Sequence, residues 1–339
     1  MSTTPRLGRT PRRAQISALS TYVPPRLLTN ADLERMVETS NEWILQRTGI
    51  RQRHIVDPGV ATSDLAREAA LQAVGQAGLT PEQIELIVVG TTTPDMIFPS
   101  TACLLQHKIG AHSAWGFDLG GACSGFTYAL TVATQFVASG THDAALAVGA
   151  DTMSSIIDYT DRATCVLFGD GAGAVVVTPA TGPELGIIDF HHEIDGGGGL
   201  ALCMPAGGSL RPASHETVDQ RLHYVKQDGQ TVFRFAVKKT EEAARRVLER
   251  NGLSPSDLDL FVSHQANRRI ITSAAERLGL EERQVIINIE DYGNTTAGTI
   301  PLALKDARES GRLKKGDLVL LASVGAGFTV GAVLLRWAY

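Results

Sequence analysis

Cys123 is the residue best placed to do chemistry, because it stands in the small-residue segment GGACSG at 120–125. A strand is predicted to end near Leu119, and a helix is predicted to begin near Cys123. At a helix start, unpaired N–H groups and the positive end of the helix dipole favour the thiolate, the nucleophilic form of cysteine. Cys123 is therefore a candidate nucleophile for acyl transfer, holding the acyl group as a thioester. A buried structural cysteine is the alternative interpretation.

Two candidate partners for Cys123 lie in the second part of the chain. His264 follows an apolar run at 258–262, at the carboxyl end of a predicted strand, where α/β sheets usually place ligand-binding groups. Asn294 follows a second predicted strand at 285–289 and precedes a predicted helix. Taken singly, His264 can be a surface or core histidine, and Asn294, beside glycine, can be a turn residue.

An internal repeat connects these candidates. Residues 78–88 (GLTPEQIELIV) resemble residues 252–262 (GLSPSDLDLFV), and residues 143–148 resemble residues 317–322 at the same shift of 252 − 78 = 174. Two matches in order at one register predict a duplication of two similar halves. The same shift carries Cys123 to position 297, close to Asn294, and carries Gly90 to His264. Two halves packed about a pseudo-twofold axis would bring Cys123, His264 and Asn294 into one site.

Each half is predicted to contain a helix, a turn and a buried strand. Helical apolar spacing at 65–77 precedes a strand at 84–89, and the segment 243–262 repeats this scheme. Alternating helices and strands predict the α/β class, with mixed, largely parallel sheets. The predicted division is a flexible tail at 1–14, a half at 15–185 with the nucleophile, and a half at 186–339 with the histidine and asparagine. The irregular stretch at about 191–230 is predicted to be a loop or lid.

Composition excludes several classes of function. A net charge of −5 over 339 residues gives no general attraction to nucleic acid or to an anionic membrane. No apolar run approaches the roughly 20 residues that span a bilayer, and the first residues lack the apolar core of a signal peptide. The four cysteines are far apart and form no CxxC pair, so neither a metal site nor a redox dithiol is expected. We expect a cytoplasmic protein with free thiols.

Several motifs resemble the β-ketoacyl-acyl-carrier-protein synthase III family of the thiolase superfamily. They are GACSGF around Cys123, SHQANRRI around His264, YGNTTAGTIP around Asn294, and GAGFTVGAVLLRW near the C-terminus. The resemblance extends from about Gln15 to the C-terminus. It implies a thiolase-like five-layer αβαβα sandwich built from two duplicated halves, and a homodimer.

The resemblance also implies a reaction. Cys123 would take the acyl group of an acyl-coenzyme A primer, and decarboxylation of malonyl-acyl carrier protein would supply the carbanion that attacks it. This decarboxylative Claisen condensation initiates type II fatty acid synthesis and needs no cofactor. His264 and Asn294 would hydrogen-bond the malonyl thioester oxygen, and the backbone N–H groups of Cys123 and Ala326 would form the oxyanion hole.

Binding roles follow from the same resemblance. They are coenzyme A binding by Trp43, Arg162 and Asn267, an acyl pocket with Phe98 and Val324, and carrier-protein binding by Arg234, Arg268 and Arg269. Phe98 would reach across the homodimer into the acyl pocket of the other protomer. Core packing for Trp43 and a solvated helix face for Arg268 are the alternative interpretations. Glu276 and Arg277 stand where the family can have two lysines, which weakens the predicted basic patch.

Two other functions are consistent with these motifs. One is an acyltransferase or starter ketosynthase of a specialised pathway, with the same fold and cysteine. The other is a non-catalytic protein that only binds carrier protein. Retention of His264 and Asn294 favours condensation over the first alternative, and retention of Cys123 argues against the second, since a binding scaffold needs no nucleophile.

Overall fold

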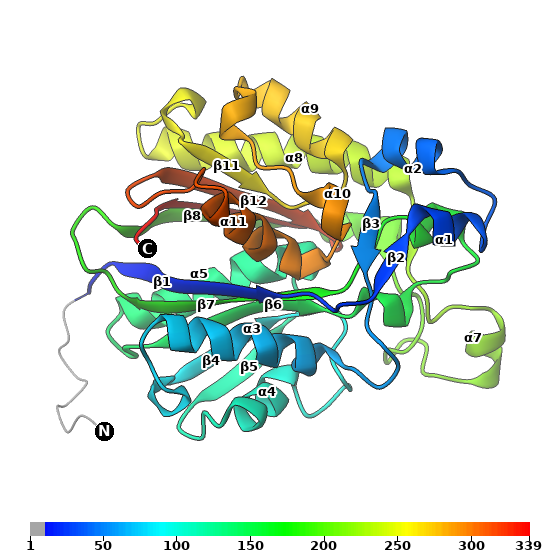
Figure 1. Cartoon of the computed structure of the whole chain (residues 1–339), viewed down its shortest axis with the longest axis horizontal. Coiled ribbons are helices and arrows are strands. Elements are labelled where there is room, and N and C mark those ends of the chain that lie inside the picture. Colours follow the sequence, from blue (N-terminus) through cyan, green and yellow to red (C-terminus); the bar gives the residue numbers. More distant parts are fainter. Residues whose placement is uncertain (1–10) are drawn as a thin grey trace.

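Two β-sheets form the centre of the computed structural model, which describes residues 11–339 (Figure 1). Most of the tail predicted at 1–14 lies outside the described residues. The first sheet has the order β1-β7-β6-β4-β5 and comprises β1 (Ala14–Tyr22), β4 (Leu86–Gly90), β5 (Trp115–Leu119), β6 (Ala145–Asp151) and β7 (Gly171–Pro179). The second has the order β11-β12-β13-β8 and comprises β8 (Gly186–Ile194), β11 (Leu260–Ser263), β12 (Leu318–Gly325) and β13 (Thr329–Arg336).

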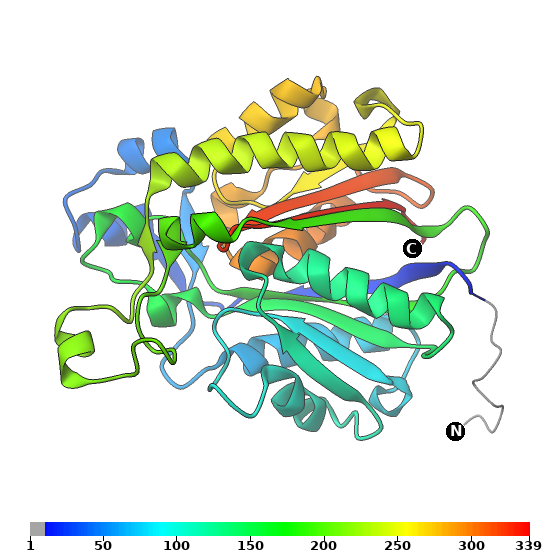
Figure 2. The same ribbon diagram turned by 180° about the vertical axis from the view of Figure 1, so that it is seen from behind.

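Helices complete five layers around these sheets, as Figures 1 and 2 show from opposite sides. The outer face of the first sheet is covered by α3 (Thr62–Gln76) and α4 (Thr101–Ile109), and that of the second by α8 (Gly229–Arg250) and α9 (Arg268–Leu278). Between the sheets lie α5 (Gly125–Ala138) and α11 (Thr299–Glu309). The sequence of α5 contains no charged residue, and only Gln135 in it is exposed, as expected of a helix between two sheets, whereas α8 exposes a charged face.

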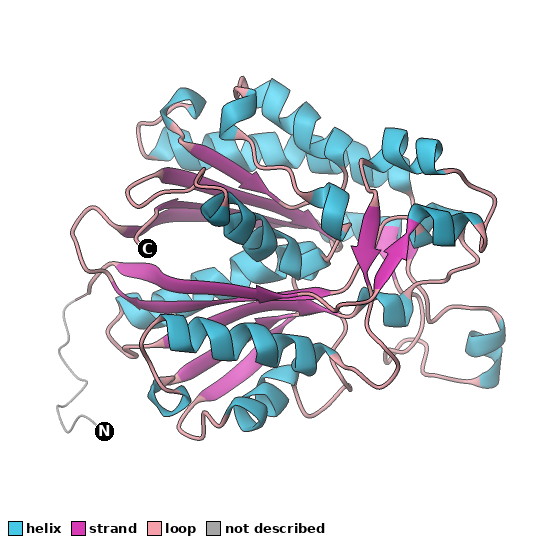
Figure 3. Cartoon of the chain, viewed as in Figure 1, coloured by secondary structure: helices cyan, strands magenta, loops and turns pink. Residues whose placement is uncertain are grey.

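Smaller elements lie mainly beyond one end of the strands of the two sheets (Figure 3). They are β2 (Leu27–Thr29), α1 (Asn30–Glu34), α2 (Asn41–Thr48), β3 (Gln52–His54), α6 (Arg162–Cys165), β9 (Leu202–Cys203), α7 (His215–Asp219), β10 (Lys226–Gln227) and α10 (Ile289–Tyr292). Three expectations need correction. The sheets are mixed but not largely parallel, because β12 and β13 form a hairpin and hairpin strands pair antiparallel. The stretch 191–230 is not all loop, since β8 continues to Ile194 and the short strands β9 and β10 pair.

The third correction concerns the strand predicted at 285–289. Only Val285 pairs as a strand residue, with Phe261, and α10 begins at Ile289. The buried side chain of Gln265 takes over the backbone groups of this segment, accepting from the Asn288 N–H at 3.0 Å and donating to the Ile286 carbonyl at 3.1 Å. The Gln265 side-chain amide therefore satisfies two backbone groups of this segment that would pair with a neighbouring strand if a fifth strand were present.

The duplication is visible in the backbone. Ala122 and Thr296, which are 296 − 122 = 174 residues apart, both have the left-handed conformation, with φ of 46° and 48°. Positive φ is uncommon for residues other than glycine, so its recurrence at equivalent positions marks two copies of one turn. These turns precede α5 and α11, the two helices between the sheets. The boundary between the halves at 185/186 stays a prediction.

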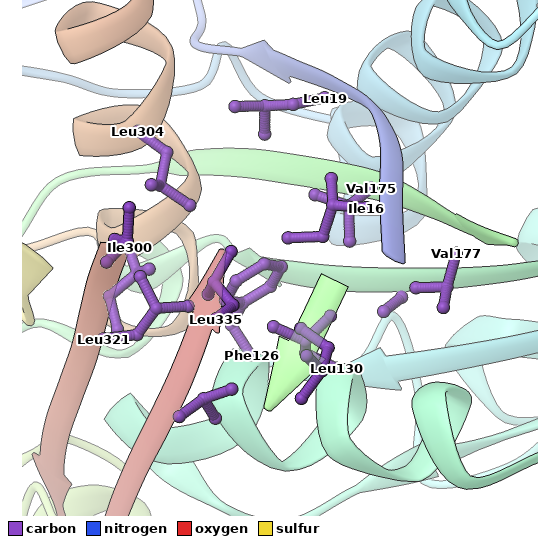
Figure 4. Close-up of a cluster of buried hydrophobic side chains, with 14 of the residues drawn as sticks. Ile16, Leu19, Phe126, Leu130, Val175, Val177, Ile300, Leu304, Leu321 and Leu335 are labelled. Carbon is purple, nitrogen blue, oxygen red and sulfur yellow. The ribbon is translucent and has the colours of Figure 1, made fainter. Parts of the chain in front are cut away.

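The space between the sheets is filled by one apolar cluster (Figure 4). Its members come from both halves and include Ile16, Leu19, Phe126, Leu130, Val175, Val177, Ile300, Leu304, Leu321 and Leu335. All are at most 2% exposed, and full burial of such a side chain contributes about 1.5–3 kcal/mol. This shared core fixes α5 and α11, and hence the turns before them, relative to both sheets.

A buried carboxylate adds a polar link between the halves at the end of β6. Asp151 is fully buried and accepts from the N–H groups of Thr92 at 2.7 Å and Thr93 at 3.2 Å. It also accepts from the Ala297 N–H at 3.2 Å and from the Thr296 hydroxyl, both in the second half. A buried charge is tolerated only when it is well hydrogen-bonded, and here its donors are the segment after β4 and the turn before α11. Asp151 therefore ties the turn before α11 to the first sheet.

Candidate active site

One pocket collects six of the residues singled out from the sequence, namely Trp43, Cys123, His264, Asn267, Asn294 and Val324. It lies beyond the ends of β11 and β12 and the start of α5. The three candidate catalytic residues therefore meet, as the duplicated register predicts. Hydrogen bonds and burial show what each of them can do.

Cys123 lies in a 3₁₀ turn, Ala122–Ser124, immediately before α5. Two glycines allow the close packing around this turn. A Cβ added to Gly90 would lie 2.3 Å from the Gly125 backbone, and one added to Gly325 would lie 2.7 Å from the Cys123 nitrogen. Distances below about 3 Å are not tolerated, so only glycine fits at either position. The end of β4 is thereby held against the start of α5, and the end of β12 against the Cys123 backbone.

Burial reverses the expected titration of the cysteine. Cys123 is only 7% exposed, and burial, together with the nearby Asp151 charge, raises the pKa of its thiol to about 12. The expectation of a lowered pKa is therefore wrong for this structure, because loss of hydration outweighs the stabilisation expected at the helix start. The thiol is neutral near pH 7 and must lose its proton as it attacks.

His264 is equally buried and is held at one ring nitrogen. It follows β11, and its backbone N–H donates to the Ala322 carbonyl at 2.7 Å, which extends the pairing of β11 with β12. Its ring Nδ1 lies 2.7 Å from Thr299 Oγ1, at the start of α11. Burial lowers the pKa of His264 to about 3, so the imidazole is neutral near pH 7. Within residues 11–339 no hydrogen bond engages Nε2, the nitrogen left for the pocket.

Asn294 is oriented by its own turn. Its backbone is fixed by segment 167–169 of the first half, since the Asn294 N–H donates to the Leu167 carbonyl at 2.9 Å and the Gly169 N–H donates back to the Asn294 carbonyl at 3.1 Å. Its side-chain oxygen accepts from the Thr296 N–H at 2.9 Å. A backbone N–H can only donate, so this contact identifies the oxygen and leaves the amide NH₂ as the free end. Asn294 can therefore act as a hydrogen-bond donor in the pocket.

Comparison with known proteins identifies the family. The family model described as 3-oxoacyl-[acyl-carrier-protein] synthase III matches residues 117–196, and the model of its C-terminal part matches residues 248–337. A β-ketoacyl-[acyl-carrier-protein] synthase III of Koribacter versatilis is 60% identical over 329 residues, which cover 97% of this chain and 99% of the relative. The chain belongs to the β-ketoacyl-acyl-carrier-protein synthase III family.

Solved structures of this family have the same architecture. The 3-oxoacyl-[acyl-carrier-protein] synthase III of Aquifex aeolicus superposes with a TM-score of 0.88 at 42% identity, covering 96% of this chain and all of that one. The priming β-ketosynthase of the R1128 polyketide biosynthetic pathway superposes with a TM-score of 0.90 at 36% identity, covering 98% and 99%. The thiolase-like five-layer fold implied by the motifs is confirmed, and the protein is an acyl-transferring condensing enzyme.

Of the residues expected to bind coenzyme A, Trp43 and Asn267 line the synthase pocket, and Arg162 contacts Trp43. The Arg162 guanidinium lies 5.1 Å from the centre of the Trp43 ring, so the two side chains stack on each other. Asn267 lines the pocket, but it caps α9 by accepting from the Arg269 N–H and donates to the Arg47 carbonyl at 2.9 Å. Arg47 lines the pocket and was not predicted. Its position four residues after Trp43, on the same helix face, is the signal that could have found it.

Other predicted residues lie outside the pocket of this chain. Phe98 is 82% exposed, and Ala326 follows the pocket residue Gly325 without lining the pocket itself. Arg268 forms an ion pair with Glu290 at 3.1 Å, and Arg269 lies over the Phe233 ring at 5.5 Å. The exposed Arg234 lies in the first turns of α8. Aromatic pocket residues that sequence reasoning missed are Phe168, Phe233 and Phe328.

Two absences hold for the described part of the synthase. Within residues 11–339 no helix is long and apolar enough to cross a membrane. The same residues contain no cluster of three histidine, cysteine or acidic side chains that could hold a metal ion. The four cysteines all lie in this range and are unpaired.

Titration of His264 is expected to destabilise the synthase in acid. The pKa of His264 is about 3 in the folded protein and 6.5 for an ordinary histidine, so the unfolded chain binds the extra proton first. Stability is complete above about pH 6.5 and is lost as pH falls toward 3. From pH 6.5 to pH 5 the loss is about 2 kcal/mol, at about 1.36 kcal/mol for each pH unit. Urea unfolding of the wild type and His264→Gln at pH 7 and pH 5 measures this difference.

The control for the acid effect is His215→Gln, which removes an exposed histidine of α7. It should keep the acid sensitivity of the wild type, whereas His264→Gln should be less sensitive by about 2 kcal/mol. Equal acid sensitivity in all three proteins would contradict the buried, neutral state of His264.

Proposed function

We propose that the protein condenses an acyl-coenzyme A primer with malonyl-acyl carrier protein and thereby initiates type II fatty acid synthesis. The observation that carries this proposal is the convergence of one nucleophile and two hydrogen-bond donors, Cys123, His264 and Asn294, on a single buried pocket. A nucleophile accepts the primer, and neutral donors stabilise an enolate without removing a proton from the substrate. Family membership supports the same reaction.

The first half-reaction is acyl transfer to Cys123. The sulfur attacks the primer thioester carbonyl, coenzyme A leaves, and the thiol proton passes overall to the departing coenzyme thiolate. The negative oxygen of the tetrahedral intermediate accepts from the backbone N–H groups of Cys123 and Ala326. The close approach of Gly325 to the Cys123 nitrogen supports this pairing, because it places the two segments side by side.

The second half-reaction is decarboxylation followed by condensation. His264 Nε2–H and the Asn294 amide donate to the malonyl thioester oxygen, which becomes an enolate oxygen as carbon dioxide leaves. The enolate carbon attacks the acyl-Cys123 thioester, and the Cys123 sulfur leaves as a thiolate that water reprotonates. The two neutral donors are suited to this step, since charge develops on an oxygen in a pocket that excludes most water.

Substrate contacts extend this proposal outward from the pocket. Trp43 stacks on the adenine of coenzyme A with Arg162 on the other face, so the 5.1 Å contact between them must open to admit the ring. Arg47 and Asn267 are suited to the polar parts of the coenzyme, and no resident cofactor is needed. Arg234 and Arg269 are the better candidates for the acidic carrier protein, because Arg268 is already paired with Glu290.

A cytoplasmic homodimer completes the proposal. Met96, Ile97 and Phe98 are 47%, 83% and 82% exposed in the single chain, which leaves an apolar segment for a second copy to cover. In the homodimer, Phe98 closes the acyl pocket of the other protomer beside Val324. Neither nucleic acid nor a membrane is expected among the partners.

One experiment tests the proposed function. The protein is incubated with radiolabelled acyl-coenzyme A, and malonyl-acyl carrier protein is then added while carbon dioxide release and β-ketoacyl product are measured. The wild type should become labelled and then form product, and Cys123→Ala should not be labelled. Labelling without carbon dioxide release would overturn the condensation, and a wild type that is never labelled would overturn acyl transfer.

A second candidate is a starter ketosynthase of a specialised pathway. The structural match to the R1128 priming β-ketosynthase, with a TM-score of 0.90, favours it as the alternative. The 60% identity to the Koribacter versatilis protein supports the first proposal more strongly, against 36% for the R1128 enzyme. A panel of primers of different length and branching separates the two, because acetyl-coenzyme A should be preferred only by a fatty acid initiator of the ordinary kind.

Coenzyme A binding gives a further prediction. Trp43→Ala should weaken coenzyme A binding about tenfold or more, since stacking of a base on an aromatic ring contributes about 1–3 kcal/mol. Calorimetric titration with coenzyme A measures the change. Trp43→Phe is the matched control and should retain part of the affinity. Equal affinity of wild type and Trp43→Ala would place the adenine elsewhere.

A further inference from the structure

The hydrogen bond between His264 and Thr299 decides how the histidine can act. Thr299 is 2% exposed and is the first residue of α11, and its Oγ1 lies 2.7 Å from His264 Nδ1. A neutral imidazole carries one N–H, on either Nδ1 or Nε2. Only the Nε2–H form can donate from the pocket-facing nitrogen, and it requires that Nδ1 accept a hydrogen bond. A hydroxyl can supply that hydrogen, whereas a carbonyl in the same place could not.

The hydroxyl hydrogen of Thr299 is available for this purpose. Thr299 Oγ1 also lies 3.0 Å from the Thr296 carbonyl, which competes for the same hydrogen. That carbonyl already accepts from the Thr299 backbone N–H, so it does not depend on the hydroxyl. The Nδ1 atom is buried, and Thr299 is its hydrogen-bond partner within residues 11–339. Donation to Nδ1 therefore satisfies every group in this small network.

We propose that Thr299 is a positioning residue whose hydroxyl donates to Nδ1 of His264 and holds the imidazole with its Nε2–H directed into the pocket. The inference rests on the proposed function, in which His264 donates to the malonyl thioester oxygen. With this hydrogen bond, both hydrogen-bond donors of the site are oriented by the same turn. The turn before α11 orients Asn294 through the Thr296 N–H and orients His264 through the Thr299 hydroxyl.

Because the pKa of His264 is lowered, the position of its single ring proton decides whether Nε2 can donate a hydrogen bond. An imidazolium has N–H groups on both nitrogens and would need no selection of a tautomer. Because burial lowers the pKa of His264 to about 3, the neutral ring has a single proton near pH 7, and its location matters. Catalytic histidines held in the wrong tautomer keep their place in the structure but lose activity.

Comparison of Thr299→Val with Thr299→Ser separates the effect of the hydroxyl from the effect of the side-chain shape. Valine keeps the branched shape and removes the donor, so malonyl decarboxylation should fall about 10- to 100-fold, by analogy with the loss of groups that orient metal-ligating histidines. Acylation of Cys123 by acyl-coenzyme A should be unchanged, and Thr299→Ser should restore decarboxylation. Thr134→Val is the matched control, since its buried hydroxyl in α5 has no hydrogen-bond partner within the described residues.

The tautomer itself is measured by ¹⁵N NMR of histidine-labelled protein, with His264→Gln used to assign the signal. The wild type and Thr299→Ser should show the Nε2–H form, and Thr299→Val should lose it. An Nδ1–H form in the wild type, normal decarboxylation in Thr299→Val, or equal loss in a folded Thr299→Ser would overturn the inference. A wild type that neither acylates nor decarboxylates would instead refute the proposed function, and the NMR signal would still decide the tautomer.

Discussion

Replacing His264 or Asn294 by alanine is expected to stop malonyl decarboxylation while leaving acylation of Cys123 in place. In the proposed mechanism each side chain contributes one donor to the enolate oxygen, and removal of one such donor typically costs about 10²–10³ in rate. In the proposed mechanism neither side chain contributes to the acyl-transfer oxyanion, which accepts from backbone N–H groups. Intact-protein mass spectrometry measures acylation, and release of labelled carbon dioxide from malonyl-acyl carrier protein measures the second step.

The double variant should lose little more than either single variant, because two donors to one oxygen act as a unit. His192→Gln is the matched control. His192 is also a histidine whose pKa is lowered by burial, to about 4, but it bonds Thr131 and does not line the active-site pocket. It should decarboxylate like the wild type. Parallel loss of acylation and decarboxylation in His264→Ala would assign the histidine to proton transfer from Cys123 instead.

The sequence was sufficient to predict that these residues meet. The register of 174 relates the turn at Cys123 to the turn after Asn294, and the shared φ of Ala122 and Thr296 shows that the relation extends to the backbone. A duplicated pattern survives in sequence because each half must bury the same strands and cap the same helices. Motif order then identifies the family, which sixty per cent identity to a relative confirms.

What the sequence could not supply depends on burial and on contacts distant along the chain. The thiol pKa of Cys123 is raised because the site is closed to water, and no local pattern reports the depth of a pocket. The predicted strand at 285–289 fails because Gln265, from a different segment, occupies its backbone groups. The partner of His264, Thr299, lies 35 residues away and looks like an ordinary helix-start residue in the sequence.

Pseudo-symmetry explains why Gly325 is required beside Cys123. The register of 174 pairs Asp151 with Gly325 and Cys123 with position 297, since 151 + 174 = 325 and 123 + 174 = 297. In the first half, the Asp151 carboxylate accepts from the Ala297 N–H at 3.2 Å and closes that turn. In the second half, glycine leaves the equivalent N–H of Cys123 uncovered by any side chain at this position. An oxyanion can therefore bind at the Cys123 N–H, where the other half has a carboxylate oxygen.

Gly325→Ala is accordingly expected to lower the rate of Cys123 acylation by about 10²-fold or more, the cost of one oxyanion donor. The added Cβ would lie 2.7 Å from the Cys123 nitrogen and 2.8 Å from Thr329 Oγ1, so the backbone of the turn must shift. Gly120→Ala is the matched control in the same loop, because a Cβ there meets nothing within 4 Å. Pre-steady-state acylation by acyl-coenzyme A, with thermal unfolding to check the fold, measures both variants. A folded Gly325→Ala that acylates as fast as Gly120→Ala would show that the Cys123 N–H does not stabilise the acyl-transfer intermediate.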